Sequence, residues 1–150
     1  MPTITTFLTY DNQAEAAVKL YVSLFDGKIT SSSPGPNGSV MSLSFEILGQ
    51  SFIALNGGPS FKFSQGFSLF VACDSQAEID RYWARLTDGG SEVQCGWLTD
   101  RFGVSWQIVP KNLGSLLGAS DRTKANRALQ AMLRMKKLDM AALQSAFDGD

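Results

Sequence analysis

The sequence predicts an α+β fold made of two β-α-β-β-β modules and a C-terminal helical tail. The segment Asp11-Asn12-Gln13-Ala14-Glu15 recurs as Asp74-Ser75-Gln76-Ala77-Glu78, 63 positions later. Each copy follows a β-rich run, precedes an amphipathic stretch and leads into three further runs of strand character. After Pro110 only helical periodicity remains. Because self-similarity at a long offset is the signature of a repeated structural unit, duplication explains most of the chain.

The first module is predicted over residues 1–58 and begins with a strand and a helix. Ile4 to Tyr10 mixes β-branched, aromatic and apolar residues, which suits a strand with one buried face. Asn12 with Glu15 three residues later resembles a capping box, and Gly27 is expected to end the helix. The apolar stripe of this helix comprises Ala14, Ala17, Val18, Tyr21, Leu24 and Phe25.

Three strands complete the first module. Residues 28–33 are expected to form a short strand, and residues 34–38 form a turn-rich loop. From Val40 the period becomes two, which predicts a strand with one apolar face. Leu48-Gly49-Gln50 is expected to be the hairpin turn into the last strand, residues 51–55. The apolar face is predicted to carry Met41, Leu43, Phe45 and Ile47, and the polar face Ser42, Ser44 and Glu46.

The second module, predicted over residues 66–110, repeats this order. Residues 67–73 read as a strand, and Ser75 with Glu78 predicts a capped helix that ends at Gly89-Gly90. Further strands are predicted over residues 91–95, 97–99 and 104–109, the last two joined by a tight turn at 100–103. The buried stripe of the helix is predicted to comprise Ile79, Tyr82, Trp83 and Leu86.

The tail, residues 112–148, is predicted to be helical. One helix is expected over residues 121–137, and Asp139 can cap a short final helix. One side of the first helix is predicted to carry Ala125, Leu129, Met132 and Leu133, and the final helix bears Ala142, Leu143 and Phe147. We expect the tail to pack on its own domain or on a second subunit. The alternative is a partner-binding surface, because methionine side chains repack easily.

Composition excludes several classes of function. The chain has 150 residues, 44% of them hydrophobic and 18% charged, with a net charge near −1, which is typical of one globular domain spanning residues 1–150. No basic excess is present to neutralise a phosphate backbone, so we expect no nucleic-acid partner. The basic residues between positions 121 and 137 are expected to form the solvated side of a helix. No stretch resembles a signal peptide or a membrane span, so we expect a cytoplasmic protein without membrane contact.

The chain has two cysteines and no histidine. Cys73 and Cys95 lie in different β-rich segments, and in a reducing compartment two free thiols are expected. A nucleophilic cysteine usually needs a histidine or another electropositive neighbour to form the thiolate. Histidine cannot play that part here, so the sequence disfavours cysteine catalysis.

Two stretches identify a family resemblance. The first is Leu55-Asn56-Gly57-Gly58-Pro59 with Phe61-Lys62-Phe63, and the second is the continuous run from Gln94 to Pro110. With the paired β-α-β-β-β pattern, they resemble the PhnB-like branch of the vicinal oxygen chelate superfamily, which includes glyoxalases, bleomycin-resistance proteins and extradiol dioxygenases. The tail segment from Ala131 to Asp139 also fits that branch. The resemblance implies that the modules pair as in the glyoxalase/bleomycin-resistance fold, and it implies a homodimer.

The resemblance also implies where a metal would bind. In metal-using members, the first and last strands of each module supply four His, Gln or Glu ligands from their inward faces. The corresponding positions here are Ile4 or Thr5, Ala54, Phe67 or Ser68, and Gln107. Divalent ions prefer converging carboxylate, imidazole or thiolate donors, and only Gln107 keeps a ligand type of the family. We therefore expect neither a metal nor another cofactor.

The favoured hypothesis is a metal-free protein that holds a small apolar or aromatic ligand in the cup of the paired modules. Such a cavity is mostly apolar with a few polar groups. Gln107 would supply a hydrogen-bond donor and an acceptor. Trp83 and Trp106 are expected to pack in the core, and core packing is also the alternative for Trp97. The predicted ligand-binding residues are Thr5, Phe52, Ala54, Phe67, Trp97, Ser105 and Gln107.

Enzymatic readings remain as alternatives. A glyoxalase-like lyase, an isomerase or a dioxygenase would need an acid or base near the cup, and the candidates are Glu46, Lys62, Cys95 and Asp100. The PhnB-like branch often carries the label 3-demethylubiquinone-9 3-methyltransferase. A typical methyl transfer from S-adenosylmethionine uses a Rossmann-like sheet with a glycine-rich loop at a helix N-terminus, and this sequence predicts neither.

Overall fold

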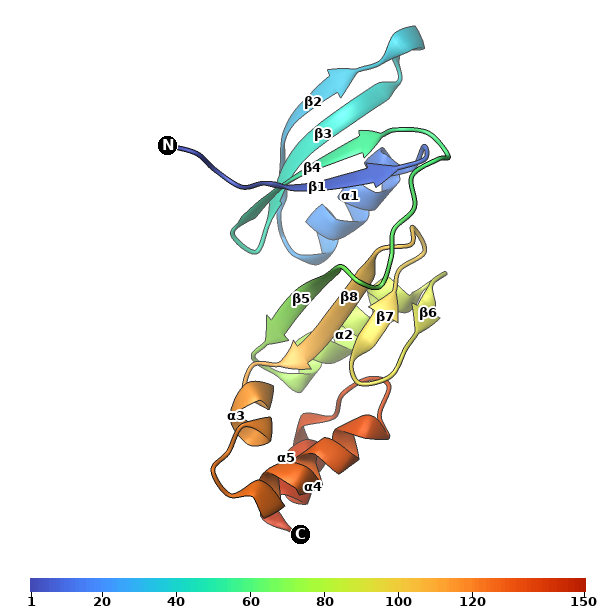
Figure 1. Ribbon diagram of the computed structural model, residues 1–150. Helices are drawn as coiled ribbons and strands as arrows, with labels where there is room; N and C mark the ends of the chain where they lie inside the picture. The colour runs from blue at the N-terminus through green and yellow to red at the C-terminus, as the bar shows by residue number, and fades with distance from the viewer. The chain divides into compact units, whose positions relative to one another are not determined.

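The computed structural model describes all 150 residues and divides into two compact units (Figure 1). Met1–Lys62 forms the first unit and contains the first module. Phe63–Asp150 forms the second unit and contains the second module together with the tail. Each module has its own four-stranded sheet, so the predicted α+β fold of two β-α-β-β-β modules is confirmed.

The first unit contains one mixed sheet with the strand order β1-β4-β3-β2. β1 and β4 are parallel, and the other neighbours are antiparallel. The elements are β1 (Thr6–Tyr10), α1 (Ala14–Leu24), β2 (Lys28–Pro34), the 3₁₀ turn η1 (Pro36–Gly38), β3 (Val40–Ile47) and β4 (Gln50–Asn56). Every predicted strand of this module is therefore present, with ends that shift by one or two residues.

The helix α1 covers one face of the first sheet and buries it. The Phe45 ring lies 6.4 Å from that of Tyr21 in α1 and stacks on Phe52 at 5.1 Å between centroids. The strand residues buried on this face are Leu8, Tyr10, Leu43, Phe45, Ile47, Phe52 and Ala54. Met41, the second residue of β3, was predicted to belong to this set but is 37% exposed. The predicted alternation of β3 is otherwise confirmed.

Both ends of α1 differ from the prediction. No side chain of the preceding segment caps the helix; instead the side-chain Oδ1 of Asn56, at the end of β4, accepts the Ala14 N–H at 2.9 Å. At the other end Asp26, not Gly27, takes the left-handed conformation, with φ of 54°. Gly27 is required for a different reason, because a Cβ there would collide with the Glu46 carbonyl.

The second unit repeats the arrangement with the order β5-β8-β7-β6, and β5 and β8 are parallel. Its sheet and first helix are β5 (Ser68–Cys73), α2 (Gln76–Thr87), β6 (Ser91–Glu92), β7 (Trp97–Thr99) and β8 (Ser105–Pro110). The capping box of Ser75 and Glu78 is present as predicted. The predicted stripe of Ile79, Tyr82, Trp83 and Leu86 is buried, and α2 packs on β5, β7 and β8.

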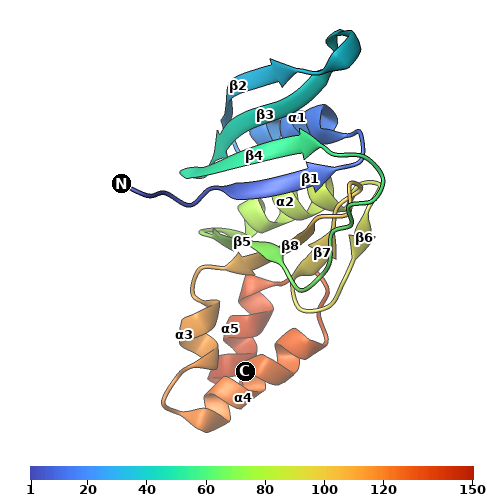
Figure 2. The ribbon, with the colours of Figure 1, turned by 45° about the horizontal axis from the view of Figure 1, so that its top comes forward.

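The tail forms three helices, which Figures 1 and 2 show together beyond the end of β8. They are α3 (Leu113–Leu117), α4 (Arg122–Leu133) and α5 (Met140–Asp148). Asp121 and Asp139 cap α4 and α5, as the sequence indicated for Asp139. The helix predicted over residues 121–137 ends at Leu133. On the predicted apolar side, Ala125 is buried, Leu129 and Met132 are partly buried, with Met132 packed against the core of the tail, and Leu133 is exposed.

Two arginines of α4 are used inside the tail. The Arg122 guanidinium donates to the Leu117 and Ala119 carbonyls at the end of α3. Arg127 donates to the Ala146 and Phe147 carbonyls near the end of α5, both at 2.9 Å. A cation at a helix C-terminus satisfies carbonyls that have no partner within the helix. These arginines therefore hold the three helices together.

None of the helices has both the length and the apolar character that a membrane span requires.

The hairpin between β3 and β4 provides a stability test. Leu48 and Gly49 are its two central residues, with φ of 49° and 80°. Both values fit a type I′ turn, for which Asn-Gly is preferred, and Leu48 is 60% exposed. We expect Leu48→Asn to raise the free energy of unfolding by about 0.5–1 kcal/mol, because asparagine tolerates the left-handed region. Urea unfolding measures this, with Leu48→Ala as the control that should gain less; a lower midpoint for Leu48→Asn would contradict the turn assignment.

Candidate functional site

The face of the second sheet opposite α2 carries the candidate site, and we call it the second open face. Side chains alternate between the two faces of a strand, and directly paired residues share a face. Phe70 in β5 pairs with Gln107 in β8, and Gln107 pairs with Trp97 in β7. These three side chains therefore form a row across three strands. Phe70 is 61% exposed, whereas Gln107 and Trp97 are half-buried.

A second row of small hydroxyl residues lies beside the first. Ser68, Ser105 and Thr99 are paired across the same three strands. The Gln107 Nε2 donates to the Ser68 Oγ at 3.0 Å, which orients the amide and leaves its Oε1 available to accept a hydrogen bond. The second open face therefore combines aromatic flanks with one oriented amide, an arrangement suited to a flat molecule that has a hydrogen-bond donor.

The corresponding face of the first sheet, opposite α1, is the first open face. Phe7 in β1 pairs with Ile53 in β4, which pairs with Ser44 in β3. Phe7 and Phe70 are related by the same 63-residue offset as the repeated segments, and Phe7 is 53% exposed. Both modules therefore present a phenylalanine at the same position of an edge strand.

Some of the predicted ligand-binding residues lie on the second open face, and others lie outside it. Ser105 and Gln107 share one face of β8, as the alternation predicted, and Trp97 lies beside Gln107 on that face. Phe67 lies before β5 and is 61% exposed, and Ser68 takes its place on that face. Thr5 lies just before β1 and is exposed.

Phe52 and Ala54 lie on the other side of their sheet. They are 3% and 0% exposed and belong to the core beneath α1. Their pairing with Phe45 and Leu43, both buried, fixes this orientation. The prediction that Phe52 and Ala54 line the ligand site is therefore wrong. The register differs by one residue, so Ile53 and Leu55 lie on the first open face instead. The run Phe52-Ile53-Ala54-Leu55 is apolar throughout, so the sequence alone did not reveal this register.

The residues on the open faces do not fit a divalent metal ion. The structure has no group of three or more His, Cys, Asp or Glu side chains that could hold one. At the positions where the resemblance implies ligands, the second open face offers Gln107 with the hydroxyl of Ser68, and the first offers apolar or hydroxyl side chains. These neutral donors lack the charge and basicity that Zn²⁺, Mn²⁺ or Fe²⁺ sites use.

The candidate acids are already engaged. The Asp100 carboxylate is 3% exposed and accepts the N–H groups of Phe102 and Val104 and the indole N–H of Trp106, at 2.9–3.0 Å. It therefore holds the β7–β8 turn and the core tryptophan in place. Glu46 lies 3.6 Å from the Lys28 ammonium, and both side chains are solvated. Neither acid resembles a buried general base.

The backbone N–H groups of the glycine pair after β4, within the first unit, are also already bonded. The Gly57 and Gly58 N–H groups donate to the Tyr10 and Asp11 carbonyls, at 2.7 Å and 3.2 Å. A Cβ at Gly57 would also lie within 3.0 Å of the Phe61 ring. These contacts extend the pairing of β1 with β4. No helix begins after the pair, so it does not form a phosphate-binding loop.

Two surface cavities lie away from the open-face rows. One, of about 500 Å³, is lined by Cys73, Asp74, Lys111, Asn112, Ser115 and Met140. The other, of about 250 Å³, is lined by Asp26, Gly27, Lys28, Glu46, Leu48 and Gly49. Neither contains a residue predicted to bind a ligand.

Comparison with known proteins places this fold in its class. A model of the 3-demethylubiquinone-9 3-methyltransferase family matches residues 2–109. A putative 3-demethylubiquinone-9 3-methyltransferase, the PhnB protein from Bacillus cereus, is 33% identical with a TM-score of 0.68, covering 72% of this chain and 99% of that chain. No curated protein shows significant similarity to this chain.

More distant structures share the fold. A protein from Pseudomonas aeruginosa is 22% identical with a TM-score of 0.60, over 73% of this chain and 98% of that one. The fosfomycin resistance protein FosX from Listeria monocytogenes, complexed with Mn(II) and sulfate, is 17% identical with a TM-score of 0.55, over 71% and 89%. These more distant proteins therefore show the fold alone. The family model and the Bacillus cereus structure show more, and this chain belongs to the PhnB-like 3-demethylubiquinone-9 3-methyltransferase family.

The role of Asp100 can be tested by substitution. Asp100→Asn replaces one carboxylate oxygen with an amide that cannot accept the Trp106 N–H, and hydrogen bonds to charged groups contribute more than neutral ones. We expect a loss of about 2 kcal/mol of unfolding free energy. A double-mutant cycle with Trp106→Phe should give a coupling energy of about 1 kcal/mol or more, and additive effects would contradict the contact.

The two thiols should differ in reactivity. Burial, with the Glu78 and Asp74 carboxylates nearby, raises the pKa of the Cys73 thiol from 9.0 to about 12. Because thiolate is the reactive form, we expect a disulfide reagent at pH 8 to modify Cys95 in the folded protein and Cys73 only after unfolding. The control is Cys95→Ser, which should be unreactive until denatured. Burst modification of Cys73 in that variant would contradict its burial.

The same shift affects stability at high pH. The neutral Cys73 thiol is favoured by the folded state, so its contribution is complete below pH 9 and is lost as pH rises toward 12. We expect Cys73→Ala to reduce the fall in unfolding free energy across that range relative to the unmodified chain. Chemical denaturation at a series of pH values measures the difference, and parallel curves would contradict it.

Proposed function

We propose that the protein binds a small apolar or aromatic molecule on the second open face, without a metal ion. The single observation that carries this proposal is the row Phe70, Gln107 and Trp97. Two aromatic side chains flank an amide whose orientation is fixed by Ser68 at 3.0 Å. Aromatic side chains, small hydroxyls and one oriented amide favour binding over turnover, because no acid or base stands beside them and these neutral donors do not suit a metal ion.

The geometry also indicates the chemistry of the ligand. Since the Gln107 Oε1 is an acceptor without a partner in the protein, the ligand should carry an N–H or O–H donor next to an aromatic ring. Phenols, hydroquinones and aromatic amides meet this description. The rings of Phe70 and Trp97 provide apolar contact on either side, and aromatic pairs of this kind contribute beyond the area they bury.

A thermal-shift screen of those three compound classes tests the proposal. A ligand that binds the folded state raises the melting temperature, and calorimetry then gives its affinity. We expect Gln107→Ala to weaken each hit about fivefold, which corresponds to one neutral hydrogen bond of about 1 kcal/mol. Ile53→Ala, at the corresponding position of the first open face, is the matched control. Equal affinities for the unmodified chain and Gln107→Ala would remove Gln107 from the site.

Metal analysis and activity assays on the same purified protein distinguish an enzyme from a binding protein. Elemental analysis of protein purified without chelator, followed by assays with methylglyoxal-glutathione adducts and catechols, should give neither stoichiometric metal nor turnover. Titration with S-adenosylmethionine should give no calorimetric signal, because the Gly57-Gly58 amides are already bonded. Tight S-adenosylmethionine binding or measurable turnover would replace this proposal with an enzymatic one.

We also propose, on the family resemblance, that the protein is a homodimer in solution and binds no nucleic acid. The second point is supported by Arg122, Arg127 and Lys137, whose charges contact helix carbonyls or the Asp80 carboxylate. Light scattering at micromolar concentration measures the first point, and a monomeric mass would contradict it.

A further inference from the structure

We infer that the C-terminal tail limits how far a ligand can extend along the second open face, and that it positions Trp97 on that face. This inference deepens the proposed function, on which its consequence for ligands rests. Its claim about Trp97 rests on contacts within the second unit alone.

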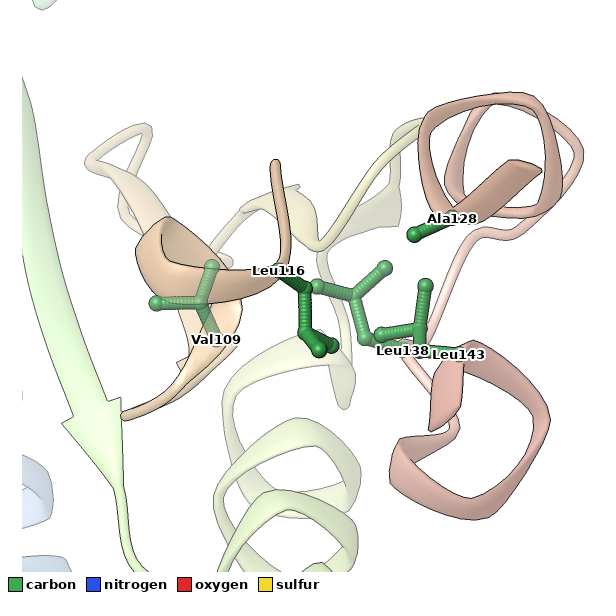
Figure 3. Packing of buried hydrophobic residues seen from close by; sticks show 5 residues of the cluster. All are labelled: Val109, Leu116, Ala128, Leu138 and Leu143. Atoms are coloured by element: carbon green, nitrogen blue, oxygen red, sulfur yellow. The ribbon is translucent and has the colours of Figure 1, made fainter. Parts of the chain in front are cut away.

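The first observation concerns Val109, which lies on the second open face beyond Gln107. It pairs with Ala72 and points to the same side as Ser105 and Gln107. Although no helix of the module covers this face, Val109 is only 2% exposed. Val109 belongs to one buried cluster with Leu116, Ala128, Leu138 and Leu143 of the tail, and Figure 3 shows Leu116 between Val109 and the other three.

The tail therefore ends the accessible part of the face. Val109 is two residues from Gln107 along β8, a separation of about 7 Å in a strand. Leu55 occupies the corresponding place in the first module and remains partly exposed. A ligand anchored at Gln107 can thus extend toward the end of β8 by roughly one ring or a few carbon atoms before it meets the tail.

The second observation concerns the turn that precedes Trp97. Cys95 and Gly96 have φ of 62° and 84°, and the Trp97 N–H donates to the Gln94 carbonyl. The tail contacts this turn directly. The Cys95 and Gly96 N–H groups donate to the Met135 and Lys136 carbonyls, both at 2.8 Å.

The side chain of Leu138 completes this contact. It is fully buried, and a Cβ at Gly96 would lie only 3.0 Å from its Cδ1. A non-glycine residue such as Cys95 rarely adopts positive φ unless surrounding contacts hold it there. Since β7 is only three residues long and begins at Trp97, the turn that the tail holds acts together with the pairing to Gln107 to set the direction of Trp97.

The third observation identifies the clamp that holds the tail. Gln76 at the start of α2 donates to the Leu138 carbonyl at 3.0 Å and accepts the Met140 N–H at 2.8 Å. Gln13 occupies the same place in the first repeat, where no tail is present. The repeated glutamine therefore contacts the tail in the second module only.

The family comparison is consistent with a separate role for the tail. The family model ends at residue 109, and the Bacillus cereus structure is 99% covered by 72% of this chain. Residues 110–150 therefore lie beyond the part matched by that family model. A tail that shortens the face and orients Trp97 would distinguish the ligands of this chain from those of members without it.

Gln76→Ala tests the positioning of Trp97, with Gln13→Ala as the matched control. The protein is labelled with 5-fluorotryptophan, and Trp97→Phe assigns the Trp97 ¹⁹F resonance. We expect Gln76→Ala to shift or broaden that resonance while those of Trp83 and Trp106 stay in place, and to raise amide exchange at Cys95 and Gly96 at least tenfold. Gln13→Ala should change neither. An unchanged Trp97 resonance and unchanged exchange at both amides would overturn the positioning role.

The reach of the face is tested with N-alkylbenzamides from methyl to octyl. For the unmodified chain we expect affinity to fall at least tenfold once the alkyl chain exceeds a few carbons, and for Gln76→Ala we expect the fall to occur at a longer chain. The same length profile in both proteins would overturn the claim. If no benzamide binds either protein, the proposed ligand class fails, while the fluorine and exchange measurements still decide whether the tail positions Trp97.

Discussion

The parallel pairing of the first and last strands of each module is the constraint on which both sheets depend. β1 pairs with β4 and β5 with β8 in parallel, whereas every other neighbouring pair is antiparallel. The helix that follows the first strand of each module packs on one face only, because a single helix cannot cover both. The opposite face is left to carry exposed side chains such as Phe7 and Phe70. The open faces are therefore a product of topology, and the duplication provides two of them.

Elements governed by local sequence could be predicted well. The Ser75–Glu78 capping box, the stripe of α2 and the alternation of β3 depend on residues a few positions apart, and all three are present. The start of α1 could not be predicted in the same way, because its capping group, Asn56, comes from 42 positions away. The end of α4 at Leu133 likewise depends on tertiary contacts, since residues 135–136 bond to the β6–β7 turn instead of continuing the helix.

The candidate site likewise combines features that local sequence predicts with features that depend on tertiary contacts. On β8, polar and apolar residues alternate, so the sequence placed Ser105 and Gln107 on one face correctly. On β4, four consecutive apolar residues hide the alternation, and only the pairing of Ala54 with Leu43 reveals which side is buried. Trp97 could be nominated from sequence, but its place beside Gln107 required the register of a three-residue strand. The hydrogen bond from Gln107 to Ser68 connects residues 39 positions apart and had no local signal.

The contacts made by Arg127 in α4 limit which substitutions the tail tolerates. Arg127 reaches two successive carbonyls of α5 through two different nitrogens, a geometry that the single ammonium of lysine does not reproduce. Exchange of Arg127 for lysine, although conservative in charge, would therefore not be conservative in structure, because one ammonium would have to replace two separate donors that hold the end of α5 against α4.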